Sequence, residues 1–173
     1  MMFHRLAATK ESQRGFTLVE LLVVIAITGL IGSVVVGAIY QVFTVSSRNT
    51  SRMTIVKQLE NAVRWITPDA QMAQSVNGDL AGSAGLSLAW NEWDGTAENV
   101  TYKMIANGQL ERSYYRNGLL QSTKVVARNI DPARTSSSFA NGTIAFTVTS
   151  AIGGYKPESV TRSFNVTLRS GKT

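Results

Sequence analysis

An apolar run with one charged side chain constrains this chain more than any other feature of its sequence. From Phe16 to Phe43 every residue is uncharged except Glu20. A helix needs about 20 mostly apolar residues to span a bilayer, so this run is long enough to do so. A carboxylate in such a segment costs about 2.5–3.5 kcal/mol on insertion scales. Glu20 is therefore a candidate functional residue that needs a partner.

The segment before the run is short, polar and basic, and it ends in Arg14 and Gly15. It lacks the apolar core that a secretory signal peptide places ahead of its cleavage site. Basic residues on the N-terminal side of a membrane helix hold that side in the cytoplasm. We therefore expect residues 1–15 inside the cytoplasm and the C-terminal part outside.

The stretch from Arg14 to Glu20 reads Arg-Gly-Phe-Thr-Leu-Val-Glu. Together with the apolar helix, it resembles the N-terminal signal of type IV prepilins and type II secretion pseudopilins, from Gly15 to about Tyr40. The resemblance implies that a membrane prepilin peptidase cuts after Gly15 and methylates the new amino terminus of Phe16. It also implies that Glu20 neutralises the Phe16 amine of a neighbouring subunit during filament assembly.

The pairing of Glu20 with an amine also has a physical basis. Cleavage after Gly15 creates a cation four residues before Glu20, and residues i and i+4 share one face of a helix. The helix dipole stabilises an acidic side chain in the first turn by about 0.3–1 kcal/mol. The alternative interpretation is an ordinary signal anchor, in which Glu20 lies at the level of the lipid headgroups.

The helix is predicted to continue past the membrane with one apolar face, which needs a partner surface. That face consists of Ile55, Leu59, Ala62, Val63 and Ile66. Thr67-Pro68-Asp69 resembles the start of a helix, so we expect a kink or a short new helix from Asp69 to about Val76. The predicted parts are a leader (1–15), a membrane-spanning or filament-core helix (16–40), an amphipathic continuation (41–76) and an exported β-rich part (77–173).

Residues 77–85 are predicted to be a small-residue loop. Past this loop the hydrophobic period changes to two, which is typical of strands. Asn107-Gly108 is a hairpin signal, Asn117-Gly118 is a second predicted turn, and 131–141 is predicted to be a polar loop. The predicted strands are 86–90, 100–105, 109–116, 124–130, 143–149 and 160–168. One amphipathic helix followed by strands favours an α+β, pilin-like fold, with the helix packed on an antiparallel sheet of about five or six strands. The order of elements resembles minor pseudopilins of the J type.

The sequence offers no catalytic or metal-binding constellation. The one histidine, His4, lies in the leader, and the chain has no cysteine for a disulfide or a metal site. Asp79, Glu92, Asp94 and Glu98 do not have the spacing of an EF-hand calcium loop, and we interpret them as turn and capping residues. We predict no cofactor, metal or small-molecule substrate, and no enzymatic activity.

Charge and tryptophans add little to the choice of function. The net charge is +6, and loss of the leader, with three basic residues and one acidic residue, leaves +4. The basic residues are scattered, so a nucleic-acid partner is not indicated. Trp65 and Trp90 are predicted to pack in the core. For Trp93, which lies in a turn, exposure at a subunit contact stays open.

The sequence therefore predicts a non-catalytic minor pseudopilin of a type II secretion pseudopilus. One helix anchors it in the bacterial inner membrane, with the C-terminal part outside the cytoplasm, and it lies in the pseudopilus after assembly. The predicted partners are the prepilin peptidase and other pseudopilins or pilins, contacted through helix packing. The alternatives are a minor pilin of a type IV or competence pilus and a membrane-anchored exported binding domain.

Replacing the predicted cleavage glycine tests the leader. We expect Gly15→Glu to block cleavage, because glycine lets the peptidase approach the backbone closely. Intact mass and N-terminal sequencing of the membrane-extracted protein measure the outcome, and the unaltered chain should begin at N-methylated Phe16. A Gly15→Glu chain still shortened by the leader length contradicts the assignment.

Overall fold

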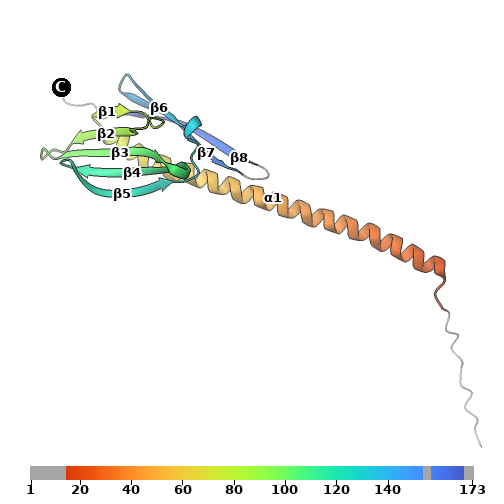
Figure 1. Ribbon diagram of the computed structural model, residues 1–173. Helices are drawn as coiled ribbons and strands as arrows, with labels where there is room; N and C mark the ends of the chain where they lie inside the picture. The colour runs from red at the N-terminus through yellow and green to blue at the C-terminus, as the bar shows by residue number, and fades with distance from the viewer. Residues whose placement is uncertain (1–14, 154–156, 170–173) are drawn as a thin grey trace, which may run out of the picture. The chain divides into compact units, whose positions relative to one another are not determined.

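The computed structural model describes residues 15–153 and 157–169, which form an α+β chain (Figure 1). One long helix, α1 (Leu18–Met72), is followed by eight strands within these residues. The predicted α+β class is confirmed. The predicted leader, apart from Gly15, lies outside the described residues. The chain divides into two units, residues 1–45 and 46–173, and each is described separately below.

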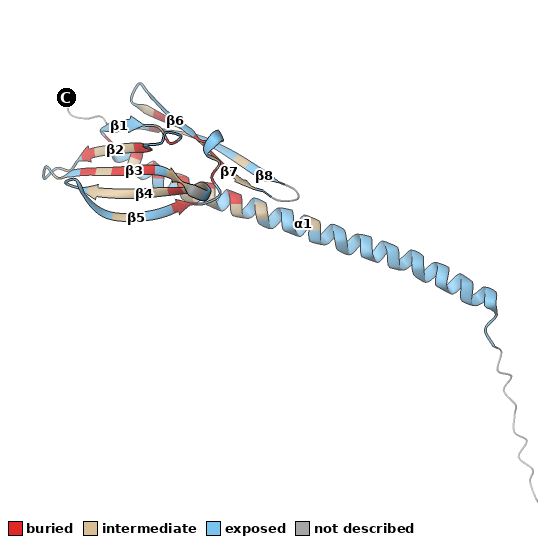
Figure 2. Ribbon diagram, in the orientation of Figure 1, coloured by how far each residue is buried: buried red, intermediate tan, exposed pale blue. Residues whose placement is uncertain are grey.

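In the first unit the structure describes an exposed apolar helix. All side chains from Phe16 to Phe43 are exposed within the chain (Figure 2). The hydroxyls of Thr28 and Ser33 donate to the carbonyls of Val24 and Leu30, at 2.7 and 2.8 Å. These hydroxyls are thus satisfied by the helix itself, as an apolar environment requires. By length and composition the helix is able to cross a membrane.

The second unit contains two antiparallel sheets and two short 3-10 helices (Figure 1). The five-stranded sheet follows chain order: β1 (Ser75–Gly78), β2 (Leu86–Asn91), β3 (Ala97–Ile105), β4 (Gln109–Arg116) and β5 (Leu119–Ala127). The three-stranded sheet consists of β6 (Ser136–Ala140), β7 (Thr143–Ile152) and β8 (Glu158–Thr167). The 3-10 helices are η1 (Ala106–Gly108) and η2 (Pro132–Arg134). Two sheets thus stand in place of the single sheet that the sequence predicted.

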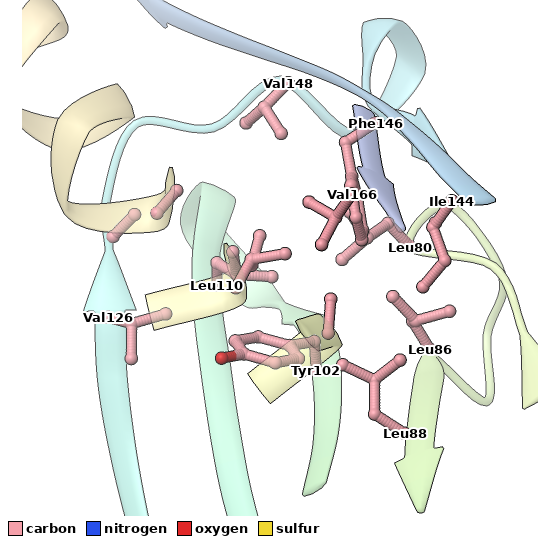
Figure 3. Packing of buried hydrophobic residues seen from close by; sticks show 14 of the residues in the cluster. Leu80, Leu86, Leu88, Tyr102, Leu110, Val126, Ile144, Phe146, Val148 and Val166 are labelled. Atoms are coloured by element: carbon pink, nitrogen blue, oxygen red, sulfur yellow. The ribbon is translucent and has the colours of Figure 1, made fainter. Parts of the chain in front are cut away.

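Both sheets and the second part of α1 share one hydrophobic core (Figure 3). The buried face of α1 repeats at intervals of three and four residues, as a helix packed on one side requires. It consists of Ile55, Leu59, Ala62, Ile66 and Ala70. Leu88 and Tyr102 come from the five-stranded sheet and Val148 from the three-stranded sheet, all fully buried. The predicted apolar face is therefore confirmed, except that Val63 is only half-buried.

We had expected a kink or a short new helix after Pro68, but α1 continues through this residue to Met72 as one helix. Proline removes one backbone N–H and normally interrupts a helix. Here Ile66 and Ala70, on either side of Pro68, are both fully buried. Packing against the core holds the helix through the proline. The expected end near Val76 was wrong, because Val76 belongs to β1.

Two strands lie where the sequence predicted loops. β1 contains Asn77-Gly78, and β6 contains Ser136, Ser137 and Ser138. Both strands are short, mostly exposed edge strands. They form because their backbones pair with β2 and β7. Their side chains do not alternate between apolar and polar, so the sequence shows no strand pattern there.

The predicted hairpin at Asn107-Gly108 and the predicted turn at Asn117-Gly118 are confirmed, and both contain left-handed residues. Asn107 and Gly108 have φ of 63° and 66°, and Asn117 and Gly118 have 48° and 77°. Gly108 also approaches the backbone of Ile130, whose N–H donates to the Gly108 carbonyl at 2.8 Å. A Cβ on Gly108 would lie 2.6 Å from the Ile130 oxygen, whereas one on Gly118 would meet open space.

These two glycines form a matched pair for a stability test. We expect Gly118→Ala to lower the free energy of unfolding by about 1–2 kcal/mol, because alanine is strained at positive φ. Gly108→Ala should lower it by a further ~1–3 kcal/mol, because the backbone must move away from Ile130. Denaturant titration of the detergent-solubilised chain measures both changes. Equal losses would contradict the close approach at Gly108.

Candidate functional site

The N-terminus of α1 is closed by a reciprocal capping box. Thr17 is the residue before the helix, and its backbone N–H donates to Oε2 of Glu20 at 3.3 Å. In return, the backbone N–H of Glu20 donates to the Thr17 hydroxyl at 3.2 Å. The Thr17 hydroxyl also donates to Oε2 of Glu20 at 3.2 Å. Two backbone donors that a helix end leaves unpaired are thereby satisfied.

The capping box changes the expected position of Phe16. Phe16 and Gly15 lie before the helix, and both are exposed. The argument that residues i and i+4 share a helix face therefore does not bring the Phe16 nitrogen to Glu20 within one chain. Pairing of Glu20 with the Phe16 amine of a neighbouring subunit stays a prediction.

Thr17 is the residue of this site that sequence reasoning missed. The spacing Thr17-Leu18-Val19-Glu20 is the Thr-x-x-Glu signature of a capping box ahead of an apolar run. The signal was therefore present in the sequence. It assigns Glu20 a structural role in its own chain, in addition to any role between chains.

Three glycines in the exposed helix have open space beside them among the described residues. A Cβ added to Gly29, Gly32 or Gly37 would meet no described atom within 4 Å. Glycine in a helix interior costs about 1 kcal/mol relative to alanine, and no packing in the described residues offsets that cost. Small residues in membrane helices allow a neighbouring helix to approach closely.

Residues 11–40 match the family model of the prokaryotic N-terminal methylation motif. The match contains Gly15, Phe16 and Glu20, and it confirms the resemblance to type IV pilin-like proteins in this segment. No solved structure matches the chain significantly. The match ends at residue 40, so the J-type assignment stays a prediction.

The other polar constellation of the chain lies in the second unit, where α1 meets the five-stranded sheet. Asp69 of α1 accepts hydrogen bonds from Nε and Nη2 of Arg112 on β4, at 2.6 and 2.9 Å. The hydroxyl of Tyr102 on β3 donates to the same carboxylate. Burial and the nearby carboxylate raise the pKa of Tyr102 far above its usual value, so the phenol stays protonated. We name Asp69, Tyr102 and Arg112 the Asp69 cluster.

Aromatic rings cover the guanidinium of this cluster. The Arg112 guanidinium lies 5.3 Å from the ring centroid of Trp65 and 5.5 Å from that of Tyr114. Lys124 on β5 lies 5.7 Å from the Trp65 ring. Trp65 is therefore a partly exposed cation–π partner and not the core residue that we expected. Trp90 is buried as expected, and Trp93 is 96% exposed.

The four acidic residues considered for calcium all have hydrogen-bond or charge partners within the chain. Asp79 accepts from the Ser137 backbone at 2.5 Å, Asp94 from Thr96 at 2.9 Å, and Glu92 from the Trp90 indole at 3.0 Å. Glu98, which is 3% exposed, pairs with Arg116 at 2.8 Å. No metal-binding group of three His, Cys, Asp or Glu side chains occurs among the residues the structure describes.

The pKa shifts of two of these carboxyls agree with their contacts. Burial acts to raise the pKa of Asp79, but hydrogen bonds from Ser137 outweigh it and hold the pKa below its usual value. Burial likewise acts to raise the pKa of Glu98, and the neighbouring Tyr114 hydroxyl and Arg116 guanidinium outweigh it. Both groups therefore stay ionised at neutral pH and serve the fold.

Removing the charge of Asp69 tests the Asp69 cluster. We expect Asp69→Ala to lower the free energy of unfolding by about 3–5 kcal/mol, because it leaves Arg112 largely buried without a counter-ion. The double variant Asp69→Ala with Arg112→Met should recover most of that loss, because no buried charge is then unpaired. Denaturant titration of the four chains in the cycle measures the coupling. Additive losses in the double variant would contradict it.

Proposed function

We propose that this chain is a non-catalytic minor pseudopilin of a type II secretion pseudopilus. A prepilin peptidase cuts it after Gly15 and N-methylates Phe16. The observation that supports this most is the methylation motif at residues 11–40, which coincides with a helix whose apolar side chains are exposed all round. Gly15 and Phe16 flank the proposed cleavage site. Both are exposed and precede the helix, so the peptidase has access to the bond between them.

The exposed helix is the proposed anchor. Exposing apolar surface to water costs about 25 cal/mol per Å², so the helix needs lipid or other helices around it. In this proposal the subunit waits in the inner membrane, with its β-rich part outside the cytoplasm, and then joins a filament whose interior consists of packed helices. The open faces of Gly29, Gly32 and Gly37 are the proposed places of close helix approach.

Glu20 is the proposed determinant of register between subunits. Transfer of an apolar helix from lipid to a helix-packed interior is nearly neutral, so polar pairing and close packing decide its position. Both hydrogen bonds that Glu20 accepts within the described residues end on Oε2. Its second oxygen is available to the methylated amine of a neighbouring subunit, which keeps its charge.

A minor pilin of a type IV or competence pilus is the alternative within the same class. The methylation motif is common to both systems, and residues 11–40 do not separate them. Isolation of the chain with other pseudopilins supports the first assignment, and isolation with a major pilin supports the second.

Two substitutions at Glu20 separate its charge from its capping role. We expect Glu20→Gln to keep the capping box, which accepts glutamine, and to lower incorporation into filaments about tenfold or more through loss of the charged pair. Glu20→Ala should lower incorporation at least as much, and cleavage after Gly15 should be unchanged in both. Quantitative immunoblots of sheared filaments and membranes measure the ratio. Normal incorporation of Glu20→Gln would sink the charge-pairing proposal.

A further inference from the structure

β5 has an open edge that none of the described strands covers. It is the last strand of the five-stranded sheet and pairs only with β4. Six of its nine residues are exposed. One row of backbone N–H and C=O groups on an edge strand faces away from the sheet and can pair with another strand.

The other described edges are shorter or carry charge. β1 and β6 have four and five residues. β8 carries Arg162 and Glu158, and the Glu158 carboxylate pairs with Arg48 at 3.3 Å. Natural proteins protect edges by such shortness and charge, and by proline. β5 has nine residues and no proline, and its one charged residue, Lys124, lies over the Trp65 ring. Its register with β4 shifts at two places, between Leu110 and Glu111 and between Tyr114 and Tyr115.

Apolar side chains line one face of this edge. Leu120 lies opposite Tyr115 in the register with β4, and Val125 lies opposite Glu111. Leu120 and Val125 are five residues apart on β5, but the register shifts between Tyr114 and Tyr115. Their partners on β4 are four residues apart, so the two side chains share a face. Leu120 is 55% exposed, and Leu119, which lies opposite Arg116 and therefore on the other face, is 69% exposed. Exposed apolar residues beside an open edge supply side-chain contacts for an added strand.

The charge near the edge is positive. From Arg112 to Ile130 the sequence has four basic residues and no acidic one. Glu111, opposite Val125, lies in register with the basic Lys103 of β3. Arg112 and Arg116 are paired with carboxylates from other strands or the helix. Lys124, on the face opposite Leu120, and Arg128, just past the strand, form no salt bridge among the described residues. Negative charge on a partner segment therefore favours its binding to this edge.

We infer that the open edge of β5 accepts an extended acidic segment of a partner protein as a sixth strand of the sheet. Backbone hydrogen bonds hold the segment. Its apolar residues contact Leu120 and Val125, and its acidic residues lie toward Lys124 and Arg128. In the proposed segment, apolar and acidic residues alternate. The apolar residues lie on the face of Leu120 and Val125, and the acidic residues lie on the face of Lys124.

Amide hydrogen exchange of the full-length chain in detergent, with defined peptides, tests this inference. A capped peptide of alternating Glu and Val should slow exchange in residues 119–127 and leave β1 and β6 unchanged. A Lys and Val peptide should slow it much less. The Glu and Val peptide with alternate N-methylated amides should have no effect, because it cannot donate backbone hydrogen bonds to the edge.

A matched pair of charge reversals completes the experiment. Arg128→Glu should weaken binding of the Glu and Val peptide about fivefold, the size of one exposed ion pair. Lys57→Glu, at an exposed position of α1, makes the same change in net charge and should leave binding unchanged. Unaltered exchange in β5, equal binding of the Lys and Val peptide, or equal losses in the two variants each overturn the inference.

Discussion

The packing of one face of α1 against two sheets is the constraint on which the second unit depends. The apolar face of a sheet must be buried against another element. The buried residues Phe146 and Val148 of the three-stranded sheet belong to the same core as Leu59 of the helix and Val100 of the five-stranded sheet. The chain has no cysteine, so no disulfide compensates for lost packing. Without the helix face, neither sheet has a complete partner surface.

The same helix has a different surface in the first unit. There its side chains as far as Phe43 are exposed, and apolar residues occupy every face of the helix. Regular secondary structure is thus continuous from Leu18 to Met72, while the required environment changes from apolar surroundings to one packed face. The capping box at Thr17 and Glu20 closes this helix without help from another chain.

The sequence predicted the elements whose side chains carry a periodic pattern, and it missed those that depend on distant partners. The helix face at Leu59 and the strands on either side of Asn107-Gly108 follow from local alternation. β6 does not, because its serines are exposed and β7 supplies its pairing. The Asp69–Arg112 pair joins residues 43 positions apart, so no local pattern reveals it. The capping box is the exception, because it was missed although its local signal, Thr-x-x-Glu, is sufficient to predict it.

The capping box also changes the energetic argument about Glu20. A carboxylate in an apolar segment is costly when it has no donors, but here Thr17 supplies a backbone N–H and a hydroxyl. The charge is therefore already stabilised in the unassembled subunit, and the helix dipole adds to that stabilisation. The amine of a neighbouring subunit favours assembly only to the extent that it stabilises Glu20 more in the filament than Glu20 is stabilised in the unassembled subunit. In the proposed filament that difference comes from a charge pair formed in addition to the cap, while the cap itself contributes equally before and after assembly.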